Sequence, residues 1–178
     1  MLRRVLSTLL IPLAAGFALI TIPAKAQPRS AAKVQPGEGR PYEVADSEVW
    51  DVPDPVSGRG YQVFVALPPS YAREPQRKYP VLYVTDADYA FPIIRQIGRR
   101  LNLDGPKLEE FILVGLSYAK GEDGAASRRR DYTPTPNGPS SAPAGTVHGQ
   151  GRAYQTYLRD QVKPFIAARY RVDPARAL

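Results

Sequence analysis

Short apolar runs separated by polar turns dominate the middle of the chain. Residues 61–67 (YQVFVAL) alternate well enough to predict a strand, and a pair of prolines follows it. Residues 81–84 (VLYV) and 111–116 (FILVGL) carry no charge, and uncharged runs of this length are typical of strands buried on both faces of a sheet. Residues 42–52 are rich in β-forming side chains, so we expect them to form a first edge strand.

Helical periodicity appears in two later stretches of the chain. Four apolar side chains at helical spacing predict a helix between the runs: Ile93, Ile94, Ile97 and Leu101. Strand, helix and strand at this spacing form a βαβ unit, which requires a parallel pair of strands. A second amphipathic helix is predicted from about residue 151 to residue 170, with Pro164 as a kink, and residues 176–178 resemble the start of another strand.

These elements define an α/β protein with a mostly parallel central sheet, an N-terminal antiparallel strand pair and flanking helices. Residues 117–146 interrupt the pattern, because they show no periodicity and contain several glycines and prolines. We expect this long irregular stretch to be functional or disordered.

The N-terminus has the pattern of a secretory signal. Residues 1–26 carry an arginine pair, an uncharged run and the small-residue site Ala24-Lys25-Ala26, so we expect cleavage after residue 26 and a periplasmic or secreted product. An uncleaved membrane anchor is the alternative, because the apolar run is nearly long enough to span a bilayer. Residues 27–40 then form a flexible tether, and residues 41–178 form the folded domain.

Composition excludes several classes of function. The 178 residues include no cysteine, which excludes a disulfide framework, a thiol nucleophile and cysteine metal sites. Loss of the leader with its three basic residues would reduce the formal charge from +7 to about +4. The sequence has no basic stripe interleaved with aromatic residues, so we expect no nucleic-acid partner, and we expect no membrane contact after cleavage.

The first candidate site residues follow directly after the strand predicted at residues 81–84. Ligands of open α/β sheets bind beyond the carboxyl ends of the strands, where Asp86, Ala87 and Asp88 form a turn. The two carboxylates could equally cap the helix that follows, and the two interpretations are compatible.

A second pattern imitates a hydrolase active site. Ser117 lies in a G-x-S-x-A sequence after a strand, and Asp131 and His148 follow it in the chain order of a Ser-Asp-His triad. A nucleophile elbow needs a helix directly after the serine, which residues 120–124 (KGEDG) do not favour. We therefore expect Ser117 to be a strand-end residue and His148, the only histidine, to be a loop residue. One histidine without clustered carboxylates predicts no metal site, and no cofactor is expected.

The order of these elements resembles one known family. The chain is similar to the N-terminal half of the esterase branch of the α/β-hydrolase fold that includes enterochelin-type siderophore esterases, esterase D-like enzymes and feruloyl esterases. The resemblance covers residues 42–178 and rests on several phrases in family order: residues 61–68, 79–84 with Asp86, 111–115, 129–135 (RRDYTPT), 157–160 and 164–174.

The resemblance implies an exported serine carboxylic-ester hydrolase that acts on a small-molecule ester. It assigns Asp86 and Ala87 to the oxyanion-hole loop and Arg130 and Asp131 to the pocket rim. At the rim we favour an ion pair between Arg130 and Asp131 over direct contact with substrate.

The family pattern also predicts what this chain lacks. Family members continue from Asp-Pro-x-Arg, here Asp173 to Arg176, into a strand and a G-x-S-x-G elbow, whereas the last residue here is Leu178. We therefore expect an incomplete α/β-hydrolase fold without the catalytic serine, acid and histidine, and inactive alone. The alternative is a non-catalytic exported binding module for a siderophore or saccharide ester. Such a module should fold cooperatively, whereas a fragment with an open sheet edge should aggregate.

Overall fold

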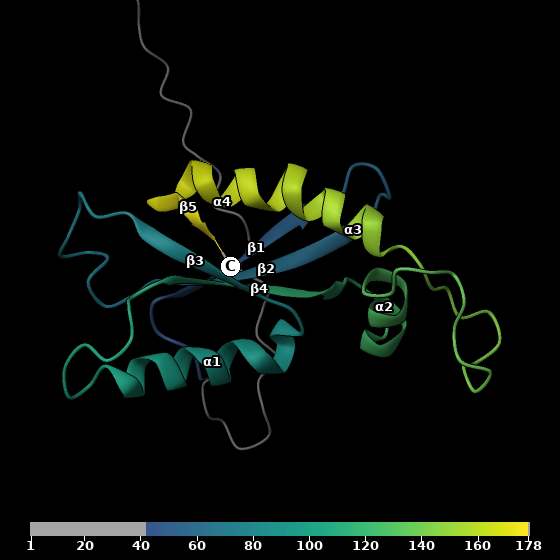
Figure 1. Cartoon of the computed structure of the whole chain (residues 1–178), viewed down its shortest axis with the longest axis horizontal. Coiled ribbons are helices and arrows are strands. Elements are labelled where there is room, and N and C mark those ends of the chain that lie inside the picture. The colour runs from purple at the N-terminus through teal and green to yellow at the C-terminus, as the bar shows by residue number, and fades with distance from the viewer. Residues whose placement is uncertain (1–41, 178) are drawn as a thin grey trace, which may run out of the picture. The chain divides into compact units, whose positions relative to one another are not determined.

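A five-stranded sheet forms the centre of the computed structural model, which describes residues 42–177 (Figure 1). The strand order is β1 (Ser47–Pro53), β2 (Gly60–Ala66), β4 (Ile112–Ala119), β3 (Tyr79–Val84) and β5 (Val172–Ala177). The pairings of β1 with β2 and of β2 with β4 are antiparallel, whereas β3 runs parallel to both β4 and β5. The predicted α/β class and antiparallel strand pair are confirmed. The predicted signal and tether lie outside the described residues.

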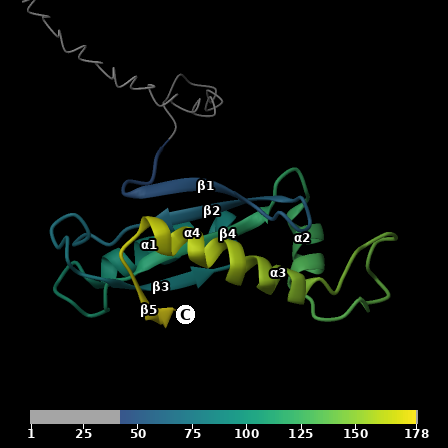
Figure 2. The ribbon, with the colours of Figure 1, turned by 90° about the horizontal axis from the view of Figure 1, so that it is seen from above.

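Helices cover both faces of the sheet (Figures 1 and 2). Helix α1 (Ala87–Leu101) joins β3 to β4 across one face, which confirms the predicted βαβ unit. The opposite face carries three consecutive helical segments: α3 (Gly151–Tyr157), the π-helical turn η1 (Leu158–Val162) and α4 (Lys163–Arg169). Helix α2 (Gly124–Asp131) follows β4 at the end of the sheet.

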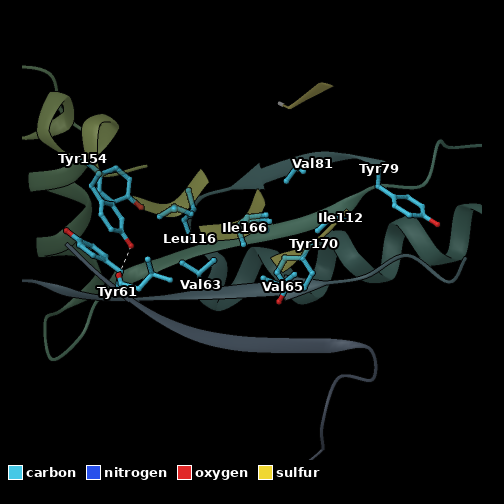
Figure 3. Close-up of a cluster of buried hydrophobic side chains, with 14 of the residues drawn as sticks. Tyr61, Val63, Val65, Tyr79, Val81, Ile112, Leu116, Tyr154, Ile166 and Tyr170 are labelled. Atoms are coloured by element: carbon cyan, nitrogen blue, oxygen red, sulfur yellow. Dashed lines mark hydrogen bonds between the residues drawn. The ribbon is translucent and has the colours of Figure 1, made fainter. Parts of the chain in front are cut away.

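The main core lies between the sheet and the α3–α4 face (Figure 3). Alternate residues of β4 enter this core, and the residues between them face α1, so almost every side chain of β4 is buried. We expected β3 to be buried on both faces as well, but Tyr83 and Val84 are only half-buried. The reason is pairing, because the register between β3 and β5 extends only from Tyr79 to Val81.

The orientation of α1 differs from the periodicity of its isoleucines. The side chains of Ile93 and Ile97 are 57% and 55% exposed, whereas Phe91 and Arg95 face the sheet and are buried. Arg95 reaches the segment before β1, where it donates to the carbonyl oxygen of Ala45. Helical spacing alone indicates an apolar face, and these tertiary contacts decide which face turns inward.

The stretch expected to be irregular contains a helix. Asp123 caps α2, because its carboxylate accepts a hydrogen bond from the amide of Ala126 at 3.1 Å. The helix sequence GAASRRRD has no apolar stripe, so periodicity could not reveal it.

A π-helical turn lies directly before Pro164, where the sequence predicts a kink. Proline has no amide hydrogen and so removes one i→i−4 hydrogen bond from the helix. The backbone widens just before it, and the amide of Lys163 donates to the carbonyl oxygen of Leu158, five residues earlier. Helix α3 therefore continues through η1 into α4.

A close approach of α1 to β4 depends on Gly115. A Cβ atom at this position would lie 2.8 Å from both Ala87 Cβ and Phe91 Cδ2, closer than real Cβ contacts. The missing side chain lets the start of α1 rest on β4, and this fixes the turn between β3 and α1.

We predict that Gly115→Ala lowers the free energy of unfolding by about 1–3 kcal/mol, because the new methyl group overpacks this contact. Urea denaturation followed by circular dichroism measures the change. Gly98→Ala is the matched control, since its added Cβ would lie 3.6 Å from Phe111 Cζ and alanine favours the helix by up to about 1 kcal/mol. Equal stability of the two variants would contradict the close packing at Gly115.

Candidate functional site

The turn between β3 and α1 holds a left-handed residue at the carboxyl end of β3. Asp86 has φ 56° and ψ 40°, a conformation that residues other than glycine adopt infrequently. Its carboxylate accepts hydrogen bonds from the hydroxyls of Tyr118 at 2.8 Å and Tyr89 at 2.9 Å, and it pairs with Arg128 Nε at 3.2 Å. Donors from β4, α1 and α2 therefore converge on this one side chain and hold the turn.

The carboxylate of Asp86 does not cap α1. Asp86 occupies the N-cap position, but its side chain accepts no hydrogen bond from the amides of the first turn, which contradicts the capping interpretation. The backbone carbonyl of Asp86 instead accepts from the amide of Ala90 at 2.9 Å. The next carboxylate, Asp88, accepts from the Ser117 hydroxyl at 2.7 Å. Both acids are thus occupied by side chains of neighbouring elements.

A cavity of about 640 Å³ opens beside this turn. Thr85, the residue before Asp86, forms one wall together with Tyr132 and Thr133 from the loop after α2. Arg152 and Leu158 of the α3–η1 helix also line the cavity. A pocket of this size with mixed polar and apolar walls can hold a small organic molecule.

Tyr132 connects the cavity wall to the turn. Burial raises the pKa of the Tyr132 phenol to about 12, and a hydrogen bond with the backbone of Asp86 opposes this rise. The phenol therefore stays neutral at physiological pH, beside the residue that fixes the turn.

A buried carboxylate organises the floor of the site. Both oxygens of Asp131 accept from the guanidinium of Arg130, at 2.8 Å each. Its Oδ2 atom also accepts from the hydroxyls of Tyr61 at 3.0 Å and Ser127 at 3.1 Å. The ion pair that the sequence favours between Arg130 and Asp131 is present, with side-chain exposures of only 7% and 4%.

The charges around Asp131 balance. Arg130 also donates to Glu122, which pairs in turn with Arg59 at 3.5 Å. Two guanidinium groups therefore neutralise two carboxylates. Burial by itself would lower the pKa of Arg130, but its hydrogen bonds to Asp131 and Glu122 outweigh burial and raise that pKa. Burial also raises the pKa of Tyr61, and the charge of Asp131 raises it further.

The structure does not bring Ser117, Asp131 and His148 together. Ser117 lies inside β4 and not on a strand-to-helix turn, and α2 begins only at Gly124. Asp131 is occupied by its four hydrogen bonds, and the His148 ring packs against Gly138 in the loop before α3. Among the hydrogen bonds of residues 42–177, none joins two members of this trio.

Several residues of the site have no signal in the sequence. Tyr61 and Asp131 are 70 positions apart, and Tyr118 and Asp86 are 32 apart, so only the fold brings them together. The sequence does contain a signal for the role of Asp123. Aspartate is a preferred N-cap residue, and Asp123 stands directly before the first residue of α2. The part of the chain that the structure describes contains no cluster of three metal-ligating side chains and no helix long and apolar enough to cross a membrane.

Comparison with known proteins identifies the family. Residues 55–178 match the model of the family described as "Putative esterase". Because this match covers more than half of the chain, the protein belongs to that esterase family. A search of curated proteins gives no match.

Solved structures support the same fold. The BES protein from Bacillus cereus superposes with a TM-score of 0.61 at 22% identity, over 79% of this chain and 55% of that one. The siderophore hydrolase EstA from Aspergillus nidulans gives 0.61 at 18% identity, over 79% and 50%. An IroE-like serine hydrolase from Shewanella oneidensis gives 0.60 at 21%, over 71% and 39%. The chain thus spans about half the length of these structures.

The buried pair predicts a large effect of a single substitution. We expect Arg130→Met to lower the free energy of unfolding by about 3–5 kcal/mol, because it leaves the carboxylate of Asp131 buried without its cation. Arg129→Met is the control, since it removes a neighbouring arginine of α2 whose guanidinium forms no ion pair among the described residues. Thermal and urea unfolding of both variants measure the difference, and similar losses would contradict a specific role for the Arg130 pair.

Proposed function

We propose that this protein supplies the oxyanion-loop side of an exported serine hydrolase that cleaves a small-molecule carboxylic ester. The observation that carries the proposal is the left-handed turn at Asp86 beside the 640 Å³ cavity at the carboxyl end of β3. Membership of the esterase family and similarity to siderophore and serine hydrolases support the same conclusion.

In this proposal the turn stabilises negative charge. Attack on an ester carbonyl places a charge on its oxygen, and backbone amides preset toward that oxygen lower the barrier. The amide of Ala87 begins α1, where no preceding turn of helix supplies an acceptor for it. Asp86 acts through its three donors as a positioning residue for that amide.

The nucleophile, the acid and the histidine are not assigned to the described residues. Ser117 donates to Asp88, and Asp131 is neutralised by Arg130, so neither is available for a triad. In the complete reaction a serine would attack the carbonyl carbon and form an acyl-enzyme, and a histidine-activated water would then release the acid. We propose that this chain alone lacks that step.

The proposal includes export. Residues 1–26 have the basic start, apolar run and Ala-x-Ala site of a secretory signal, which supports a periplasmic or secreted location.

We predict that the purified protein gives no turnover of 4-nitrophenyl acetate above the buffer rate, and that Ser117→Ala leaves this result unchanged. Release of 4-nitrophenolate, followed by absorbance, measures both. Protein-dependent turnover that disappears in Ser117→Ala would refute the proposal, because Ser117 would then be the nucleophile.

A second candidate is a non-catalytic exported binding module for a siderophore or saccharide ester. It is favoured by the cavity, which is lined by residues of α2, α3 and η1 and of the loops after β3 and α2. A binding module must fold cooperatively by itself, so a single sharp urea transition of a monomer supports it. Aggregation at low concentration supports the interpretation as part of a longer hydrolase domain.

A further inference from the structure

The cavity beside Asp86 carries one charge that no neighbouring group balances. Of its lining side chains only Asp131 and Arg152 are ionised at neutral pH. Asp131 is neutralised by Arg130, within the balanced set of two arginines and two acids. Arg152 forms no ion pair or hydrogen bond among the described residues, although the exposed side chain reaches the cavity wall.

Nearby acids do not compensate this guanidinium. Asp86 pairs with Arg128. Asp88 lies in a separate groove between α1 and β1, with Glu48 and Phe64. The wall around Arg152 is otherwise neutral, with Gln155, Thr133 and the apolar side chain of Leu158. The cavity therefore presents one positive group, Arg152, together with Thr85 from the start of the turn.

From this arrangement we infer that the cavity selects esters that carry a carboxylate on a flat apolar body. The inference rests on the proposed function and names its substrate class. In this arrangement the ester lies toward Thr85, the residue before the left-handed Asp86, the body lies against Tyr132 and Leu158, and the carboxylate pairs with Arg152. A guanidinium is suited to this role because its parallel N–H groups match the two carboxylate oxygens.

Two matched probes test the charge preference. Monomethyl terephthalate carries an ester and a carboxylate on one ring, and methyl 4-carbamoylbenzoate replaces the carboxylate by a neutral amide of similar shape. Isothermal titration calorimetry of the purified protein measures both dissociation constants. We predict that the anion binds about fivefold more tightly, a preference typical of a partly exposed ion pair. The preference should be larger at about 0.02 M salt than at about 0.5 M, because salt screens exposed charges.

Arg152→Gln should give the two probes equal affinity, because it removes the group that favours the anion. Lys163→Gln is the matched control, because it removes a cation of the same long helix that stacks on Tyr83 and does not line the cavity. This control should keep the fivefold preference.

The outcomes separate this inference from the proposed function. Equal binding of the two probes by the wild type, or a preference that survives in Arg152→Gln, overturns the charge selection and leaves an ester pocket in place. Binding of neither probe overturns both the selection and the role of the cavity. Ser117-dependent turnover would refute only the inactive state proposed for this chain.

Discussion

The buried carboxylate of Asp131 is the interaction on which the carboxyl edge of the sheet depends. It receives hydrogen bonds from Tyr61 of β2 and from Ser127 and Arg130 of α2. The Ser127 hydroxyl also accepts from the amide of Ala119 at the end of β4, at 3.1 Å. One desolvated anion thus joins two strands and a helix that has no apolar face, which explains how so polar a helix is held in place.

The same cluster positions the wall of the cavity. The backbone carbonyl of Arg130 accepts from the amide of Gln150, and that of Thr133 accepts from Gly151, where α3 begins. The loop between α2 and α3 is therefore fixed at both ends although it has no regular structure. Because Arg152 follows directly, the orientation of the proposed selective residue depends on the buried network and on the backbone contacts at the start of α3.

Close packing fixes the start of α1. Gly115 lets α1 approach β4, and the left-handed Asp86 then turns the chain into the helix. The esterase family model extends from residue 55 through β3, α1 and β4 to residue 178. The matched part of this chain covers only about half of each of these structures, so their chains contain further residues beyond the elements compared here.

The sequence by itself determined the class of fold, the family and most strand positions, because uncharged runs and alternation report directly on burial in a sheet. It also favoured the pairing of Arg130 with Asp131 over direct contact with substrate, because a guanidinium beside a carboxylate can form a charge-assisted hydrogen bond. Three features required the tertiary structure. The face of α1 that turns inward is decided by Gly115 and Arg95, and helix α2 is stabilised by a buried network with no periodic signal. The carboxylate of Asp86 meets Tyr118 and Arg128 only because β4 and α2 end beside it. Contacts between residues tens of positions apart depend on how elements pack, and a local pattern of side chains carries no information about that packing.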